Sequence, residues 1–217
     1  YKSDIERIAS GALGSEVSIS RIYASWRGLR PNLFLGDVQV RDARGRKVLD
    51  LPSVSATLSW WTVLAASPRF HSLEIIRPDL DVRRARDGRL SVAGIVLQAT
   101  GGDRAGGDWL FAQREVVVRE GRVRWTDELR GAPELTLSQL HIVLLNQWNH
   151  HRFAGRATPP AALSGPIDLR ADFRHPHFAA SPSDVTRWNG ELYADVRNTN
   201  LAGWTPYLHY PFAVASG

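Results

Sequence analysis

The stretch from Leu73 to Val92 decides the fold and reads LEIIRPDLDVRRARDGRLSV. Its first part alternates apolar and polar residues, with Leu73 and Ile75 on one side and Glu74 on the other, as a half-buried β-strand requires. Pro78 ends or kinks this strand, because proline cannot donate a hydrogen bond to a sheet ladder. The alternation then resumes, so the stretch predicts two consecutive strands separated by a proline break.

A tight turn follows the second of these strands. Leu80 and Val82 alternate with charged residues, and Asp87-Gly88 is the strongest short-range hairpin signal in the chain. A third strand ends the stretch. None of these residues is chemically reactive, so the stretch predicts a meander with one apolar face and one charged face. Such a surface suits an apolar ligand better than it suits an active site.

A short helix is predicted ahead of the strands, over residues 3–13. Ser3 and Glu6 have the spacing of a capping box, and Gly14 is a good C-terminal stop. Apolar residues recur at helical spacing and form a single stripe along it: Ile5, Ile8, Ala9, Ala12 and Leu13.

Most of the remaining chain reads as strands. One strand opens at Val17, and another runs over 33–40 with a phase shift at Gly36 that indicates a bulge. A Gly-rich loop over 98–108 and a short helical piece over 108–113 come next. Alternation and turn signals place the later strands at residues 115–119, 121–126, 134–145, 166–174 and 188–196.

The composition excludes several classes of function. The 217 residues contain no Cys, which rules out disulfides, Cys-ligated zinc and thiol catalysis. The net charge of +5 comes mainly from Arg spread along predicted strands, so nucleic acid is not an expected partner. No apolar run reaches the ~18 residues of a membrane-spanning helix. The chain begins at Tyr1 instead of Met, and we expect it to be part of a longer protein.

Two pairs of histidines have a spacing that suits metal ligands: His150-His151 and His175-x-His177. Pro176 interrupts the second pair, and no carboxylate motif accompanies either of them. We therefore expect surface or hydrogen-bonded histidines, with no metal site and no cofactor.

Two aspartates form a candidate catalytic pair. Asp79 and Asp81 share one strand face, as the two acids of a glycosidase would. Arginines follow them directly in the sequence, so a surface ion-pair face is the better interpretation. The Gly-rich loop lacks the Lys-Ser/Thr of a phosphate-binding P-loop. No catalytic residue is predicted, and the protein is not expected to be an enzyme.

The order Leu-x-Ile-x-x-Pro-x-Leu-x-Val-x-Arg, followed by Asp-Gly-Arg-Leu-x-Val, resembles the AsmA-like proteins, among them a large envelope protein of Gram-negative bacteria. Three upstream stretches carry the same resemblance: VSISRIYASWRG (17–28), LFLGDVQVRDARG (33–45) and VSATLSWWTVL (54–64). The similarity is specific over 13–95, whereas beyond Gly101 only the general texture of strands matches.

This resemblance implies a mainly β fold. We expect an elongated, twisted, mostly antiparallel sheet curled into an open groove, with a short N-terminal helix and one or two further short helices. The N-terminal amphipathic helix (1–14) would plug the end of the groove. The AsmA-like groove region would follow at 15–97. After the loop at 98–108, further groove strands at 109–217 would belong to the same elongated domain.

The resemblance also implies a function. Such a protein is anchored in the inner membrane, and its periplasmic groove shields phospholipid acyl chains on their way to the outer membrane. Expected partners are phospholipid or another acyl-chain ligand, the inner membrane through an anchor outside this chain, and further groove segments of the same protein. Alternation and resemblance together place these side chains in the groove: Val54, Ala56, Leu58, Leu73, Ile75, Leu80 and Val82.

Two other classes of protein fit the same strands. A β-sandwich interaction or carbohydrate-binding module of an extracytoplasmic protein would bury its apolar faces against a second sheet. An assembly factor for outer-membrane proteins would use the edge of the sheet instead. Whether the apolar face is covered by a second sheet separates the sandwich from the groove.

Overall fold

The computed structural model describes residues 2–13, 15–41, 45, 47–59, 70–92, 95–96, 105–176 and 187–208. They form one twelve-stranded sheet and three short helices, so the mainly β prediction is confirmed. The strands are β1 (Glu16–Arg27), β2 (Arg30–Arg41), β3 (Lys47–Leu58), β4 (Phe70–Ile76), β5 (Asp79–Arg84), β6 (Leu90–Val92), β7 (Ile95–Val96), β8 (Glu115–Asp127), β9 (Leu135–Gln147), β10 (His150–Thr158), β11 (Ile167–Arg174) and β12 (Asn189–Val196). The helices are α1 (Lys2–Leu13), α3 (Ala105–Ala112) and α4 (Leu201–Trp204).

The strands follow one another across the sheet almost in chain order. β1, β2 and β3 pair in sequence, β4 and β5 lie one after the other alongside β8, and β8 to β12 complete the sheet. All pairings are antiparallel except those of β8 with β4 and β5. These two are parallel because the chain passes through α3 before it enters β8. The predicted antiparallel sheet is therefore mixed at this one place.

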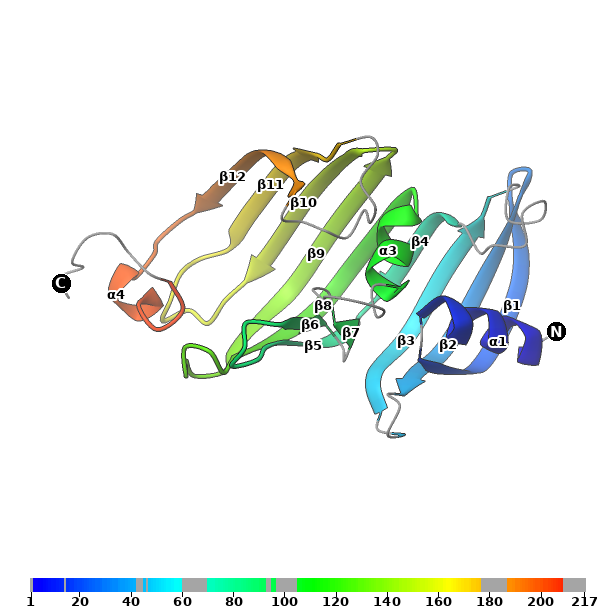
Figure 1. The fold of residues 1–217 in the computed structure, drawn as a ribbon, viewed down its shortest axis with the longest axis horizontal. Helices are drawn as coiled ribbons and strands as arrows, with labels where there is room; N and C mark the ends of the chain where they lie inside the picture. The colour runs from blue at the N-terminus through cyan, green and yellow to red at the C-terminus, as the bar shows by residue number, and fades with distance from the viewer. Residues whose placement is uncertain are drawn as a thin grey trace.

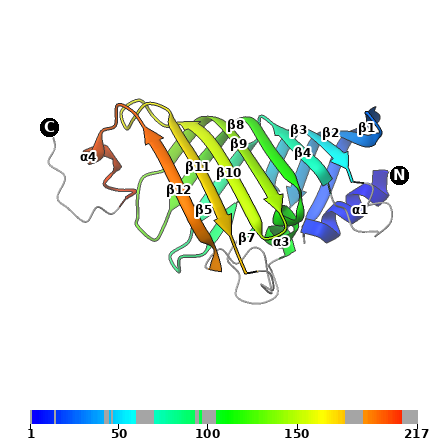
Figure 2. The ribbon, with the colours of Figure 1, turned by 90° about the horizontal axis from the view of Figure 1, so that it is seen from above.

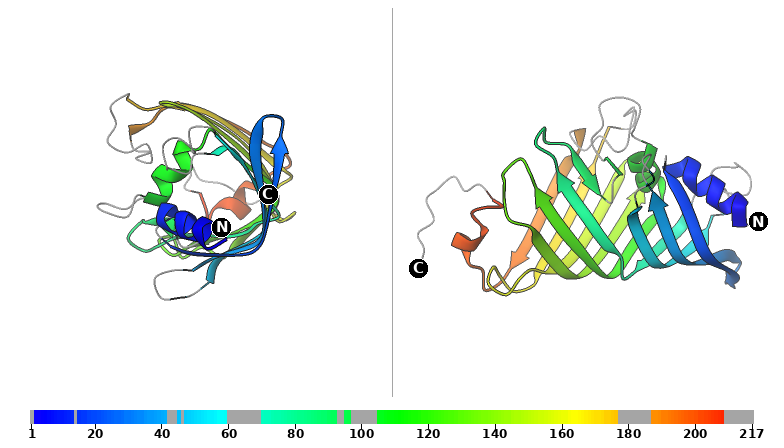
Figure 3. Two further views of the ribbon diagram at one scale, coloured as in Figure 1. Left: turned by 90° about the vertical axis from the view of Figure 1, so that its right-hand side faces the viewer. Right: turned by 90° about the horizontal axis from the view of Figure 1, so that it is seen from below.

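The sheet is curled, with its helices on one side. Figure 1 shows α1 in front of β1 to β3 and α3 in front of β4 and β8. Viewed from above, the strands β8 to β12 lie side by side and slope across the long axis (Figure 2). Viewed from its end, the sheet curves around α1 and α3 (Figure 3). We call the face toward these helices the inner face and the opposite face the outer face.

Helix α1 covers the edge strand β1 as well as the inner face. The Glu6 carboxylate accepts a hydrogen bond from the amide of Ile19 (2.7 Å), and the Ser10 hydroxyl accepts one from Val17 (2.9 Å). These bonds satisfy amide groups that an edge strand would otherwise leave open. The helix begins at Lys2, so Ser3 lies inside it and the predicted capping box is wrong.

Several predicted elements are confirmed with different bounds. Residues 115–126 form the single strand β8 instead of two strands. The short helical piece is α3, whose first residues, 105–108, belong to the predicted Gly-rich loop; residues 98–104 of that loop lie outside the described part of the chain. Gly88 has a φ of +84°, and its amide donates to the carbonyl of Ala85 (2.9 Å), which confirms the predicted turn.

Four non-glycine residues with positive φ lie along one line across the sheet: Asp37 in β2, Arg77 between β4 and β5, Glu120 in β8 and Gln139 in β9. The register follows this line, since Gly36 pairs with Ser53 in β3, which pairs with Ile76 in β4. Ile76 pairs with Arg119 in β8, where Gly121 pairs with Leu140 in β9. We call this line of four residues the crease. It includes the predicted phase shift near Gly36, and at each crossing the apolar side chains beyond it return to the inner face. In β2, for example, Leu35 and Val38 both pack into the core although they are three residues apart.

Candidate functional site

The inner face is a sealed hydrophobic core at the β1 end of the sheet. Ile5 and Ala9 of α1 and Trp109 and Leu110 of α3 pack against it and remove it from water. Its fully buried side chains come from five strands: Val17, Ile19, Val38, Val40, Leu51, Val54, Ala56, Leu73 and Val116.

All seven predicted groove residues lie on this inner face. The register pairs Val54 with Ile75 and Ala56 with Leu73, while Leu80 lies beside Val123 of β8. Their exposure falls into two groups. The buried members, beneath the helices, are Val54, Ala56 and Leu73, and the half-buried members are Leu58, Ile75, Leu80 and Val82. A role in lipid contact stays a prediction for all seven.

Toward β12 the inner face remains apolar but opens to solvent. Ala171 in β11 is 8% exposed, whereas Leu192, its partner in β12, is 65% exposed. Alternation and register place uncharged side chains on this part of the face: Val123, Leu137, Leu140, Ile142, Phe153, Ala157, Ile167, Leu169, Ala171, Leu192, Ala194 and Val196. A continuous apolar surface therefore leads from the sealed core to the edge of the sheet.

These open-face residues were missing from the predicted groove. The signal that could have found them is the alternation in β11, where Ile167, Leu169, Ala171 and Phe173 each precede a charged residue. This alternation predicts a strand, but by itself it does not show which of the two faces lines a groove. Strand β10 was not predicted, since small residues around Gly155 blur its alternation.

An aromatic cluster lies where α3 meets β10 and the end of β11. The His151 ring stacks on Trp188 at 4.4 Å between ring centroids and on His175 at 5.2 Å, while Phe111 of α3 contacts it edge-on. The Nδ1 atom of His151 is 2.7 Å from the amide oxygen of Asn146. The cluster ties the helix to the sheet.

Both stacked imidazoles are buried. Burial, together with the nearby His175 and His150, lowers the pKa of His151 to about 4, so its ring is neutral at pH 7. His150 instead faces Asp172 at 2.6 Å near the surface. His177 lies outside the described residues. No group of three metal-ligating side chains occurs within the described residues.

Asp79 and Asp81, the candidate catalytic carboxylates, make surface ion pairs. Asp81 accepts two hydrogen bonds from Arg124 of β8, at 2.7 and 3.0 Å, and Asp79 lies 3.8 Å from the same guanidinium. The interpretation as an ion-pair face is confirmed, although its arginine comes from the neighbouring strand and not from the run after Val82. Next to them, Arg84 pairs with the buried Asp127.

These features define a class of protein: a single curled sheet whose inner face is largely apolar, covered by helices at one end and open toward the other. No helix in the described part of the chain is long and apolar enough to cross a membrane.

Comparison with known families agrees with this class. The family model described as YhdP protein matches residues 1–216. The chain therefore belongs to the YhdP family, and the resemblance to AsmA-like proteins is confirmed. No curated protein and no solved structure matches the chain.

Proposed function

We propose that this chain is a periplasmic segment of an inner-membrane-anchored protein that passes phospholipid acyl chains along its inner face. The lipid would travel between the inner and outer membranes and so support the permeability barrier of the outer membrane. The protein acts by binding and shielding and breaks no bond.

The apolar inner face is the observation that supports this proposal. Toward β12 its side chains are uncharged and increasingly exposed, and no second sheet covers them among the described residues. An apolar surface that is exposed to solvent in this way normally binds a ligand. The sandwich alternative requires a second sheet, so the single sheet favours the groove.

The physical chemistry of such a face suits transport. Each methylene group that leaves water contributes about 0.8 kcal/mol, and this attraction has no preferred direction. An acyl chain therefore gains nearly the same free energy at each point along a uniform apolar strip. It can move along the strip without breaking specific hydrogen bonds.

The edge of the sheet supports the expected continuation of the groove. Strand β12 pairs only with β11 among the described strands, and nearly all of its residues are exposed. An open edge is a template for another strand. Further groove segments of the same protein would extend the apolar strip from here.

Arginine substitutions on the open and sealed parts of the face test the proposal. Leu169 is half-buried on the inner face, so the guanidinium of Leu169→Arg can reach water and the melting temperature should stay near wild type. Phospholipid that co-purifies with the chain, measured by mass spectrometry, should fall severalfold. Ala56 is 1% exposed, and Ala56→Arg should unfold the domain.

The matched control is Ala154→Arg, an exposed position on the outer face of β10 that pairs with Arg170. This variant should keep both its melting temperature and its lipid. Folded Leu169→Arg protein that retains all its lipid would contradict transport along the inner face.

A further inference from the structure

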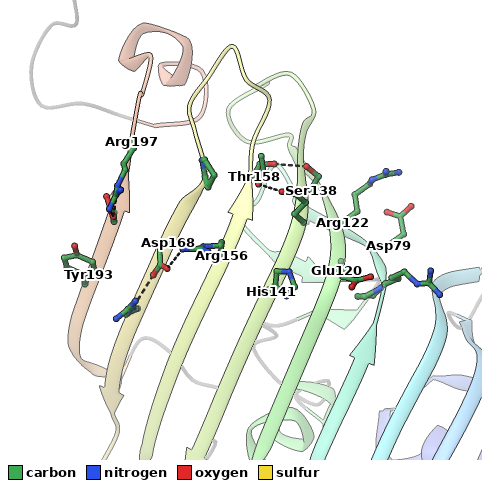
Figure 4. Close-up of a pocket in the computed structure, with 17 residues that line it drawn as sticks. Asp79, Glu120, Arg122, Ser138, His141, Arg156, Thr158, Asp168, Tyr193 and Arg197 are labelled. Carbon is green, nitrogen blue, oxygen red and sulfur yellow. Dashed lines mark hydrogen bonds and ion pairs between the residues drawn. The ribbon is translucent and has the colours of Figure 1, made fainter.

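A polar hollow opens on the outer face, opposite the apolar face. Its volume is about 1450 Å³, and it crosses the sheet from β5 to β12. Figure 4 shows its side chains standing on neighbouring strands around His141. The charged side chains that line it are Arg77, Asp79, Glu120, Arg122, Arg156, Asp168, Arg170, Asp195 and Arg197.

The crease forms one wall of this hollow. Three of its four residues, Arg77, Glu120 and Gln139, line the hollow, and each has a φ between 50° and 54°. Residues other than glycine seldom adopt this backbone conformation, and it occurs preferentially at functional sites. Strained backbone and a concave polar surface therefore coincide on the same residues.

The arginines of the hollow carry more positive charge than their partners neutralise. Arg156 (3.6 Å) and Arg170 (3.2 Å) share the single carboxylate of Asp168. Arg122 stands on β8 opposite Asp79 of β5, two strands from Arg156, and makes no ion pair with any residue that the structure describes. The lining of the hollow holds five arginines and four carboxylates, so it carries a net charge of +1.

The spacing of these arginines suits one tetrahedral anion. Strands lie about 4.8 Å apart, so the backbones of β8 and β10 are separated by about 10 Å. On β9, the strand between them, His141 is the register partner of Arg156, whereas Arg122 lies beside Ser138, three residues along the strand. A group between these two positions is within reach of both arginine side chains, and guanidinium forks bind phosphate oxygens in pairs.

We propose that this outer hollow binds a phosphate ester, held by Arg122 and Arg156. Arg170 adds charge from β11. Glu120 has no ion-pair partner among the described residues, and its carboxylate accepts a hydrogen bond from a hydroxyl or ammonium group elsewhere on the ligand. Because the sheet separates this site from the inner face, it is distinct from the acyl-chain path.

Titration of the chain with small esters tests this site. Glycerol 3-phosphate represents a free phosphate ester, glycerophosphoethanolamine represents a lipid headgroup, and inorganic phosphate is the third probe. We expect saturable binding of at least one ester by calorimetry, tighter than that of inorganic phosphate. Arg122→Gln and Arg156→Gln should each weaken it by about tenfold, the effect of losing one charge-assisted contact.

The matched control is Arg152→Gln. Arg152 is exposed on the same outer face of β10 but lies outside the hollow, so its substitution should leave ester binding unchanged. Leu169→Arg on the inner face should also leave it unchanged. Equal weakening by Arg152→Gln would show an adventitious ion only, and it would overturn the proposal, as would the absence of saturable binding to both esters.

Discussion

His151 is the residue whose chemistry departs most from its ordinary behaviour. Its ring is 1% exposed, its Nδ1 contacts Asn146, and its Nε2 has no hydrogen-bond partner within the described part of the chain. A charged imidazole there would lose its hydration without gaining a partner. The same burial that holds the aromatic cluster together therefore makes the cluster sensitive to acid.

We predict that stability falls as the pH drops from about 6.5 toward 4. The pKa of His151 in the folded chain is about 4, below the ordinary value of 6.5, so the unfolded chain takes up the proton first. The stabilisation is fully present above about pH 6.5 and is lost as the pH falls toward the folded pKa. Each kcal/mol lost should lower the melting temperature by about 2–4 °C.

Thermal melts between pH 7.5 and 4.5 measure this effect. His151→Gln removes the titrating group, so the variant should be less stable at pH 7.5 but should show a shallower decline with acid. An identical decline in both proteins would show that other groups cause the loss.

At the scale of elements, Gln113 connects α3 with the sheet. It is fully buried; its side-chain oxygen accepts from the amide of Phe70 in β4 (2.8 Å), and its side-chain nitrogen donates to the carbonyl of Trp109 (2.5 Å). The carbonyl of Gln113 accepts from the Asn146 side chain of β9 (2.7 Å). One residue thus holds a helix and two strands in place.

Gln113→Ala should destabilise the protein by about 1–3 kcal/mol, because it leaves the buried amide of Phe70 without its acceptor. Urea unfolding measures the change. Gln147→Ala, at an exposed position of β9, is the control and should change stability by less than about 0.5 kcal/mol. Equal effects of the two substitutions would contradict the bridging role of Gln113.

The local sequence pattern predicted most of the strands, because alternation and turn formation depend on residues that are close together in the sequence. The strands around Leu73 and Leu80 and the turn at Gly88 followed from it directly. The parallel pairing of β8 did not, since it depends on a crossover through α3 between segments distant in sequence. Of the crease, the sequence predicted only the irregularity at Gly36, because a positive φ at a residue other than glycine cannot be read from the residue type.

The candidate site was predictable in part for the same reason. Alternation placed Val54, Ala56 and Leu73 on one face, and the three lie in one buried core. It could not show that α1 and α3 cover these residues, since alternation reports that a face is apolar and not what lies on it. The open part of the face required the register of β8 to β12.

At the scale of the whole molecule, the two faces of one sheet differ in chemistry. The inner face is largely apolar from α1 to β12, and the outer face carries most of the arginines and carboxylates. Strand β12 presents both faces to solvent at neighbouring residues. Leu192 points to the inner face and is 65% exposed, while Glu191 points to the outer face, is also exposed and lies outside the polar hollow.

Photocrosslinking from these two neighbours tests the central claim most directly. A photoreactive amino acid at position 192 should crosslink to phospholipid in cells, because it stands on the apolar path. The same amino acid at position 191, which is exposed on the outer face and lies outside the polar hollow, should give severalfold less lipid adduct. Equal lipid crosslinking from both positions, or more from position 191, would contradict transport along the inner face.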